Sequence, residues 1–120
     1  FTVSGGRVIV NALIGEVTTQ IGNVAHVTKI IANPTVGSDV DMCATVDIDN
    51  LEAGGKFTLP AAVASAATIS NAGCIALPLL GMIVAVGTID LSTAANSVTG
   101  NTMWTLFYTP LDDAARVVAA

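Results

Sequence analysis

The sequence predicts an all-β fold, a single β-sandwich or jelly-roll-like domain of short antiparallel strands that covers residues 1–120. Several segments alternate apolar and polar residues with a period of two, which is the pattern of half-buried strands. Glycine, proline and asparagine separate these segments at short intervals, as in sandwiches. Hydrophobic residues make up 52% of the chain but aromatic residues only 4%. A chain of this length has room for one hydrophobic core.

The first two expected strands lie in the N-terminal third. Arg7–Ile14 is bounded by the pair Gly5-Gly6 at its start and by Gly15 at its end, and its even-numbered residues are expected to share the buried face. These residues are Val8, Val10, Ala12 and Ile14. Val24–Ala32 is rich in β-branched residues and is expected to end at Asn33-Pro34, because proline cannot continue a ladder of hydrogen bonds.

The most regular alternation covers Asp39–Asp49 and predicts one continuous strand with a buried face and a solvent-exposed face. The residues expected on the buried face are Val40, Met42, Ala44, Val46 and Ile48. Cys43 is interpreted as a small buried hydrophobic residue. With Cys74 it allows at most one disulfide, and the sequence leaves open whether the two pair.

The C-terminal half predicts two further strands, Gly87–Ser92 and Thr102–Thr109. The second has large apolar residues on both faces, so it is expected to be central or to meet a neighbouring subunit. Asn50–Gly55 is expected to form a hairpin turn, and Asn96–Asn101 to join the last two strands. Leu59–Ala67 fits either a short helix or a crossing loop.

Catalytic motifs are missing from the sequence, and we expect neither an enzyme nor a catalytic, cofactor-binding or metal site. His26 is the single histidine, and no G-x-S-x-G nucleophile accompanies it. Asp47, Asp49 and Glu52 faintly resemble a calcium loop that lacks its third ligand and its glycine. The sequence leaves open whether these three residues bind calcium or form a solvated acidic face.

The distribution of charge argues against nucleic acid and membrane as partners. The net charge is -5. The four basic residues are scattered singly, so they form no patch for phosphates. These are Arg7, Lys29, Lys56 and Arg116. The strongly apolar run Cys74–Val86 is interrupted by Pro78 and Gly81 and has no basic flank that would fix an orientation, which argues against a membrane span.

The aromatic residues Trp104, Phe107 and Tyr108 are the candidate interface residues. On an alternating strand in a chain with few aromatic residues, such rings usually serve as core or interface anchors. A sugar-binding face is the alternative. The surplus of apolar residues over charged ones predicts that part of the surface is buried in an assembly of several copies.

Five segments spread over nearly the whole chain resemble small virion proteins of tailed bacteriophages, of the head decoration, cement or head-fibre kind. They are FTVSGGR (1–7), LIGEVTT (13–19), ANPTVGSDVD (32–41), GTIDL (87–91) and WTLFYTPLDD (104–113). The resemblance implies a structural protein on the capsid surface of the virion that decorates and stabilises the capsid. Its expected partners are the major capsid protein and copies of itself, as a trimer. It also implies an N-terminal arm, expected to precede Phe1.

Two other functions are kept as alternatives. One is a tail-tube, neck or fibre domain of the same kind of particle, which would differ in its symmetry. The other is a carbohydrate- or host-surface-binding module, which would use the exposed aromatic rings for recognition.

Overall fold

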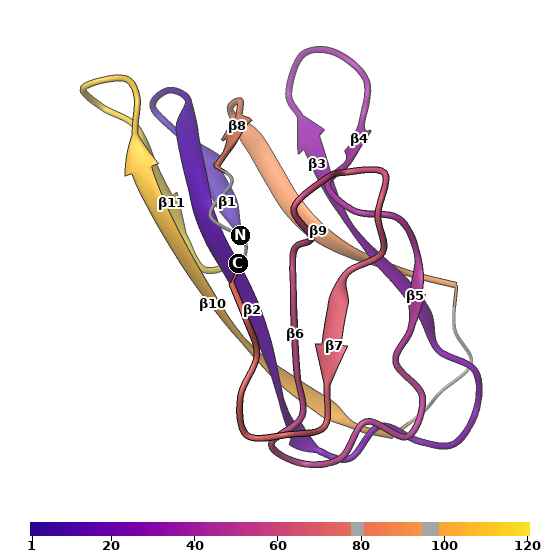
Figure 1. The fold of residues 1–120 in the computed structure, drawn as a ribbon. Helices are drawn as coiled ribbons and strands as arrows, with labels where there is room; N and C mark the ends of the chain where they lie inside the picture. Colours follow the sequence, from indigo (N-terminus) through magenta and orange to yellow (C-terminus); the bar gives the residue numbers. More distant parts are fainter. Residues whose placement is uncertain (78–80, 95–98) are drawn as a thin grey trace.

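The computed structural model describes residues 1–77, 81–94 and 99–120, and its strands form two antiparallel sheets packed face to face (Figure 1). The predicted β-sandwich is confirmed, and the described residues contain no helix. The strands are β1 (Thr2–Ser4), β2 (Val8–Thr19), β3 (Val27–Pro34), β4 (Val40–Asp41), β5 (Val46–Asp47), β6 (Lys56–Thr58), β7 (Thr68–Ser70), β8 (Met82–Val84), β9 (Gly87–Thr93), β10 (Asn101–Pro110) and β11 (Arg116–Val118).

One sheet has the order β11-β1-β9-β3-β4, and β5 also pairs with β3. The other sheet, called the β10 sheet below, has the order β10-β2-β6-β7, and β8 also pairs with β2. The longest pairing joins β2 and β10 over almost their full lengths. Two clusters of buried side chains fill the space between the sheets, one large and one centred on Phe57.

Strand β2 carries a bulge that the sequence pattern did not reveal. Phe107 pairs with Ala12 but Tyr108 pairs with Val10, so Asn11 is an extra residue on β2. The buried residues are Val8 and Val10 before the bulge and Leu13, Gly15 and Val17 after it. The prediction that Ala12 and Ile14 face the core was therefore wrong, because the extra residue moves the later positions to opposite faces. Gly15 lies inside the strand and does not end it.

Gly15 makes room for the centre of the smaller cluster. A Cβ atom at this position would lie 2.6 Å from Cε1 of Phe57, so only glycine leaves the ring its place. Phe57 is fully buried and meets Trp104 edge to face, with ring centroids 4.6 Å apart and planes at 86°. This arrangement fixes the inner side of β10 against β2 and β6.

The continuous strand predicted over Asp39–Asp49 is wrong, because the chain bends between β4 and β5. The consecutive residues Met42 and Cys43 are both buried, which strict alternation forbids. Two hydrogen bonds with Ile30 hold the bend. The Met42 amide donates to the Ile30 carbonyl (2.8 Å), and the Ile30 amide donates to Cys43 Sγ (3.4 Å). Val40 consequently stays exposed, although the alternation placed it in the core.

The connections differ from the predicted turns. Residues 59–67 form an irregular loop, not a helix, between the neighbouring strands β6 and β7 of one sheet. The Ser65 carbonyl of this loop accepts a hydrogen bond from the Ala44 amide (2.9 Å). Asn50–Gly55 is not a hairpin turn, because it leads from β5 in one sheet to β6 in the other. Gly54 has φ +89° in this connection, a conformation that favours glycine. Half of the predicted turn Asn96–Asn101, residues 96–98, lies outside the described residues.

Candidate interface on the outer face of the β10 sheet

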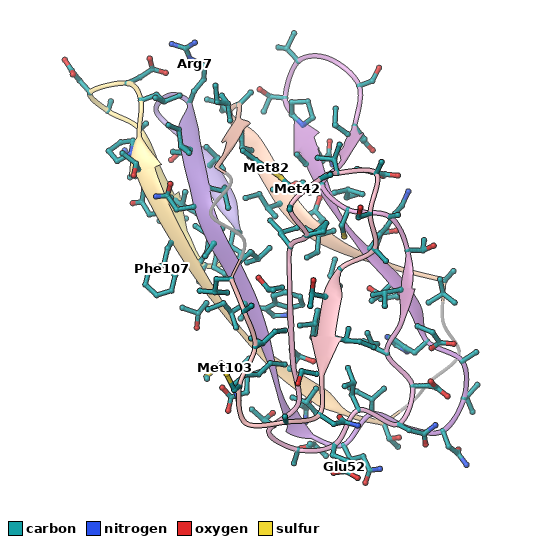
Figure 2. All side chains as sticks on the ribbon, viewed as in Figure 1. Arg7, Met42, Glu52, Met82, Met103 and Phe107 are labelled. Carbon is teal, nitrogen blue, oxygen red and sulfur yellow. The ribbon has the colours of Figure 1, made fainter. Side chains whose placement is uncertain are left out.

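Strand β10 carries the three predicted interface residues, but they lie on two different faces. Met103 and Phe107 point away from the sandwich, with 55% and 54% of their surfaces exposed. Figure 2 shows both along the outer side of β10. Trp104 and Tyr108 lie on the opposite face of the strand, because side chains alternate along it. The three aromatic residues therefore do not form one flat platform.

Trp104 is held by the core. Its ring contacts Phe57 edge to face and packs against both buried clusters. Tyr108 lies opposite the buried Val10 and is 36% exposed. Phe107 is thus the most accessible of the three predicted residues, and the inner position of Trp104 indicates a structural role.

Apolar residues of neighbouring strands extend the exposed surface that begins at Met103 and Phe107. Ile9 on β2 lies directly opposite Ile83 on β8, which is 70% exposed. Ile9 also lies opposite Thr109, two residues after Phe107. We call Ile9, Ile83, Met103 and Phe107 the outer apolar strip. Sequence reasoning missed Ile9 and Ile83, because nothing local indicated that β8 would pair with β2.

Polar contacts at both ends of the strip leave little free charge there. At one end Arg7 contacts Asp112, with Nη2 3.0 Å from Oδ1. At the other end Lys56 Nζ lies 3.7 Å from Oε2 of Glu16. The hydrogen bonds from Arg7 lower the pKa of Asp112 to about 2, and the pKa of Arg7 is raised by the same pair. An ion pair thus lies at each end of the strip, and between Phe107 and Ile9 the Asn11 side chain donates to Thr109 Oγ1 (2.8 Å).

The acidic residues considered for calcium do not gather into a site. Asp47 Oδ1 accepts hydrogen bonds from the amides of His26 (2.8 Å) and Asp49 (3.1 Å), and both bonds lower the pKa of Asp47. Glu52 uses its amide to donate to Asn71 Oδ1 (3.0 Å). Among residues 1–77, 81–94 and 99–120, no three metal-ligating side chains come together. Asp47 thus serves to fix the backbone of the turn that follows β5.

The two cysteines are both free thiols in the structure. Cys43 is buried beneath the bend between β4 and β5, and burial raises the pKa of its thiol. Cys74 is exposed. Cys43 and Cys74 therefore do not form a disulfide in this structure, a point that the sequence left open.

Two of the small cavities among the described residues are lined mainly by apolar atoms. One, of about 280 Å³, lies between the sheets beside Phe1, Leu13 and Trp104. The other, of about 250 Å³, lies between the β3–β4 hairpin and β8, beside Val40, Met82 and Ile83. Both fall below the usual volume of a pocket for a drug-sized ligand. The second adjoins the outer apolar strip at Ile83.

The part of the chain that the structure describes contains no helix of the length and apolarity needed to cross a membrane. Comparisons with protein-family models, with curated proteins and with solved structures find no match to this chain.

Proposed function

We propose that this chain is a structural subunit of a tailed-bacteriophage virion, which decorates the capsid surface and stabilises the closed shell. The observation that carries the proposal is the outer apolar strip, in which Ile83, Met103 and Phe107 are exposed on one sheet of a chain with only 11% charged residues. Exposed apolar surface that gathers on one face marks interaction sites in folded proteins. The resemblance of five sequence segments to phage virion proteins supplies the location.

The mechanism is mechanical and involves no turnover of substrate. Subunits bind one another and the major capsid protein, and each contact removes apolar surface from water. A contact of about 800 Å² per partner contributes roughly 20 kcal/mol at about 25 cal/mol per Å², against an association cost of about 4–15 kcal/mol. Many such contacts across subunit joints resist expansion of the shell. The trimer expected from the sequence belongs to the capsid-bound state in this proposal, at a local symmetry axis of the head.

The test is rebinding of the purified protein to tailed-phage particles prepared without it. Wild-type protein should restore bound density on the capsid surface in an electron-microscopy map and should raise the temperature at which particles release DNA. Ile83→Ser, in the strip, should weaken rebinding at least tenfold. Val36→Ser is the matched control, because Val36 is 87% exposed but lies in the β3–β4 hairpin loop.

Particles that lack the protein also distinguish a location on the capsid from a location in the tail. A decoration protein is dispensable for closing the head and joining the tail, so such particles should keep both. Particles without tails, or heads that never close, would assign the chain to the neck or tail instead.

The carbohydrate-binding alternative is weakened by the placement of the aromatic rings. A sugar-binding platform needs rings on one accessible face, whereas Trp104 faces the core and Phe107 faces solvent. Glycan-array binding that disappears in Phe107→Ala would nevertheless favour this alternative over the virion proposal.

A further inference from the structure

Strand β10 forms a long open edge of its sheet. Within the described part of the chain it pairs only with β2, so one side of its ten residues has no strand beside it. All ten residues are exposed or half-buried, and Figure 1 shows β10 at the border of the molecule. An open edge presents unpaired amide and carbonyl groups that are a template for another strand.

This edge lacks the features that usually prevent pairing between molecules. Asn101–Pro110 contains no charged residue, and its one proline is the last residue. The bulge at Asn11 lies on β2, so it does not interrupt β10. The other described strands that pair on one side only have two or three residues each; they are β4, β5, β7, β8 and β11. Short strands, charges, prolines and bulges are the common protections of an edge, and β10 has none along most of its length.

We propose that β10 pairs antiparallel with β10 of a second copy of this chain, across a two-fold axis that passes beside Thr105. The two β10 sheets then form one continuous sheet. In this register Thr105 faces Thr105 of the partner subunit, and Met103 faces Phe107 of the partner subunit. This inference goes beyond the proposed function, since it concerns the isolated protein and gives a dimer where the sequence suggested a trimer.

The self-complementary sequence around Thr105 is the reason for choosing a second copy as the occupant. Antiparallel pairing about a two-fold axis beside Thr105 places each residue opposite the residue of the partner subunit that lies equally far on the other side of position 105, and both point to the same face. On the outer face this brings a methionine against a phenylalanine twice, a favourable contact between sulfur and an aromatic ring. On the inner face Trp104 meets Leu106 of the partner subunit. The apolar strips of the two copies thereby become one surface.

The C-terminal residues lie close to this contact. Strand β11 follows β10 after a short turn. Beyond β11, Ala119 and Ala120 line a cavity together with Trp104, so they lie beside the inner face of β10. A two-fold axis beside Thr105 therefore brings the C-terminal residues of both copies near the contact, and it places the Pro110 end of one copy beside the Asn101 end of the other.

The decisive experiment places a charge on the two-fold axis. Thr105 is exposed, so Thr105→Lys should leave the fold intact while placing two ammonium groups directly opposite each other. Asn101→Lys is the matched control on the same face of the same strand. In the dimer the two Asn101→Lys side chains would lie about 27 Å apart, a distance at which salt screens their repulsion.

Sedimentation of the purified full chain over micromolar concentrations measures the outcome. Wild type and Asn101→Lys should give about 24 kDa, twice the 12.0 kDa of one chain. Thr105→Lys should dissociate at least tenfold more readily, and so should Thr105→Glu. A mixture of these two variants should recover the dimer. Circular dichroism should match wild type in each variant, which shows that the fold is intact.

Several outcomes would overturn the proposal: a wild-type monomer or trimer throughout the range, equal dissociation of Thr105→Lys and Asn101→Lys, or failure of the mixture to recover the dimer. The virion proposal stands or falls separately. A monomer that rebinds particles normally removes only the two-fold contact, whereas a dimer that ignores the capsid removes only the virion role.

Discussion

Gly15 offers the sharpest test of the packing between the two sheets. In Gly15→Ala the new Cβ would lie 2.6, 2.7 and 3.0 Å from three atoms of the Phe57 ring, where ordinary carbon contacts need about 3.5–4.0 Å. The ring is fully buried and held by Trp104, so it has little freedom to move. Overpacking of this kind costs about 1–3 kcal/mol, and the lower entropy of the unfolded alanine chain returns about 0.4–1 kcal/mol. We expect a net loss of about 1–2 kcal/mol.

Measuring Gly15→Ala in a second protein, Phe57→Leu, shows whether the loss comes from the contact with the Phe57 ring or from a general intolerance of alanine in this strand. Leucine lacks the two closest ring atoms, so Gly15→Ala in a Phe57→Leu protein should cost about 0.5 kcal/mol or less, or stabilise slightly. Urea unfolding, followed by the fluorescence of Trp104, the single tryptophan, measures all four members of the cycle. Gly73→Ala is the control, because nothing lies within 4 Å of its Cβ position. Equal costs in the two backgrounds would refute the contact as the cause.

Three further predictions address the core, the thiols and the acid range. Leu13→Ala should lower the free energy of unfolding by about 2–5 kcal/mol and Val36→Ala by less than about 0.5 kcal/mol, measured in urea; similar losses would contradict the assigned burial. Folded protein should react rapidly with a thiol reagent at Cys74 and slowly at Cys43, until denaturant exposes the second thiol. Arg7 lowers the folded-state pKa of Asp112 to about 2, so this carboxylate stabilises the fold above about pH 4, and its contribution disappears toward pH 2. The melting-temperature advantage of wild type over Asp112→Asn should therefore shrink over that range; a constant difference would contradict the pair.

The sequence predicted the all-β sandwich because its evidence is distributed along the chain. Gly87–Ser92 and Thr102–Thr109 match β9 and β10 within one residue at either end, and Val24–Ala32 overlaps most of β3. Such agreement follows from local alternation and turn residues, which act independently of partners. The failures arise where long-range packing decides. The bend after Asp41 depends on hydrogen bonds with Ile30, a residue that no local pattern links to it.

The candidate interface was only partly accessible to sequence reasoning. Two apolar faces on Thr102–Thr109 predicted either a central strand or a surface that meets a neighbour. The first alternative is wrong, because β10 lies at the edge of its sheet. The second stays a prediction. Which ring faces solvent depends on the pairing of β10 with β2, and Ile83 joins the strip only through the pairing of β8. Both pairings connect residues far apart in the sequence.

The bulge at Asn11 links the core to the proposed dimer contact. With unbroken alternation from Val8, Glu16 would point between the sheets and Val17 would face solvent. The extra residue reverses this, so Val17 is buried and Glu16 contacts Lys56 outside the core. At both register shifts of this pairing the extra residue, Asn11 or Thr18, belongs to β2, so β10 itself has no extra residue. The irregularity that allows the core to pack thus lies on the covered strand, and it does not interrupt the edge proposed to pair with a second copy.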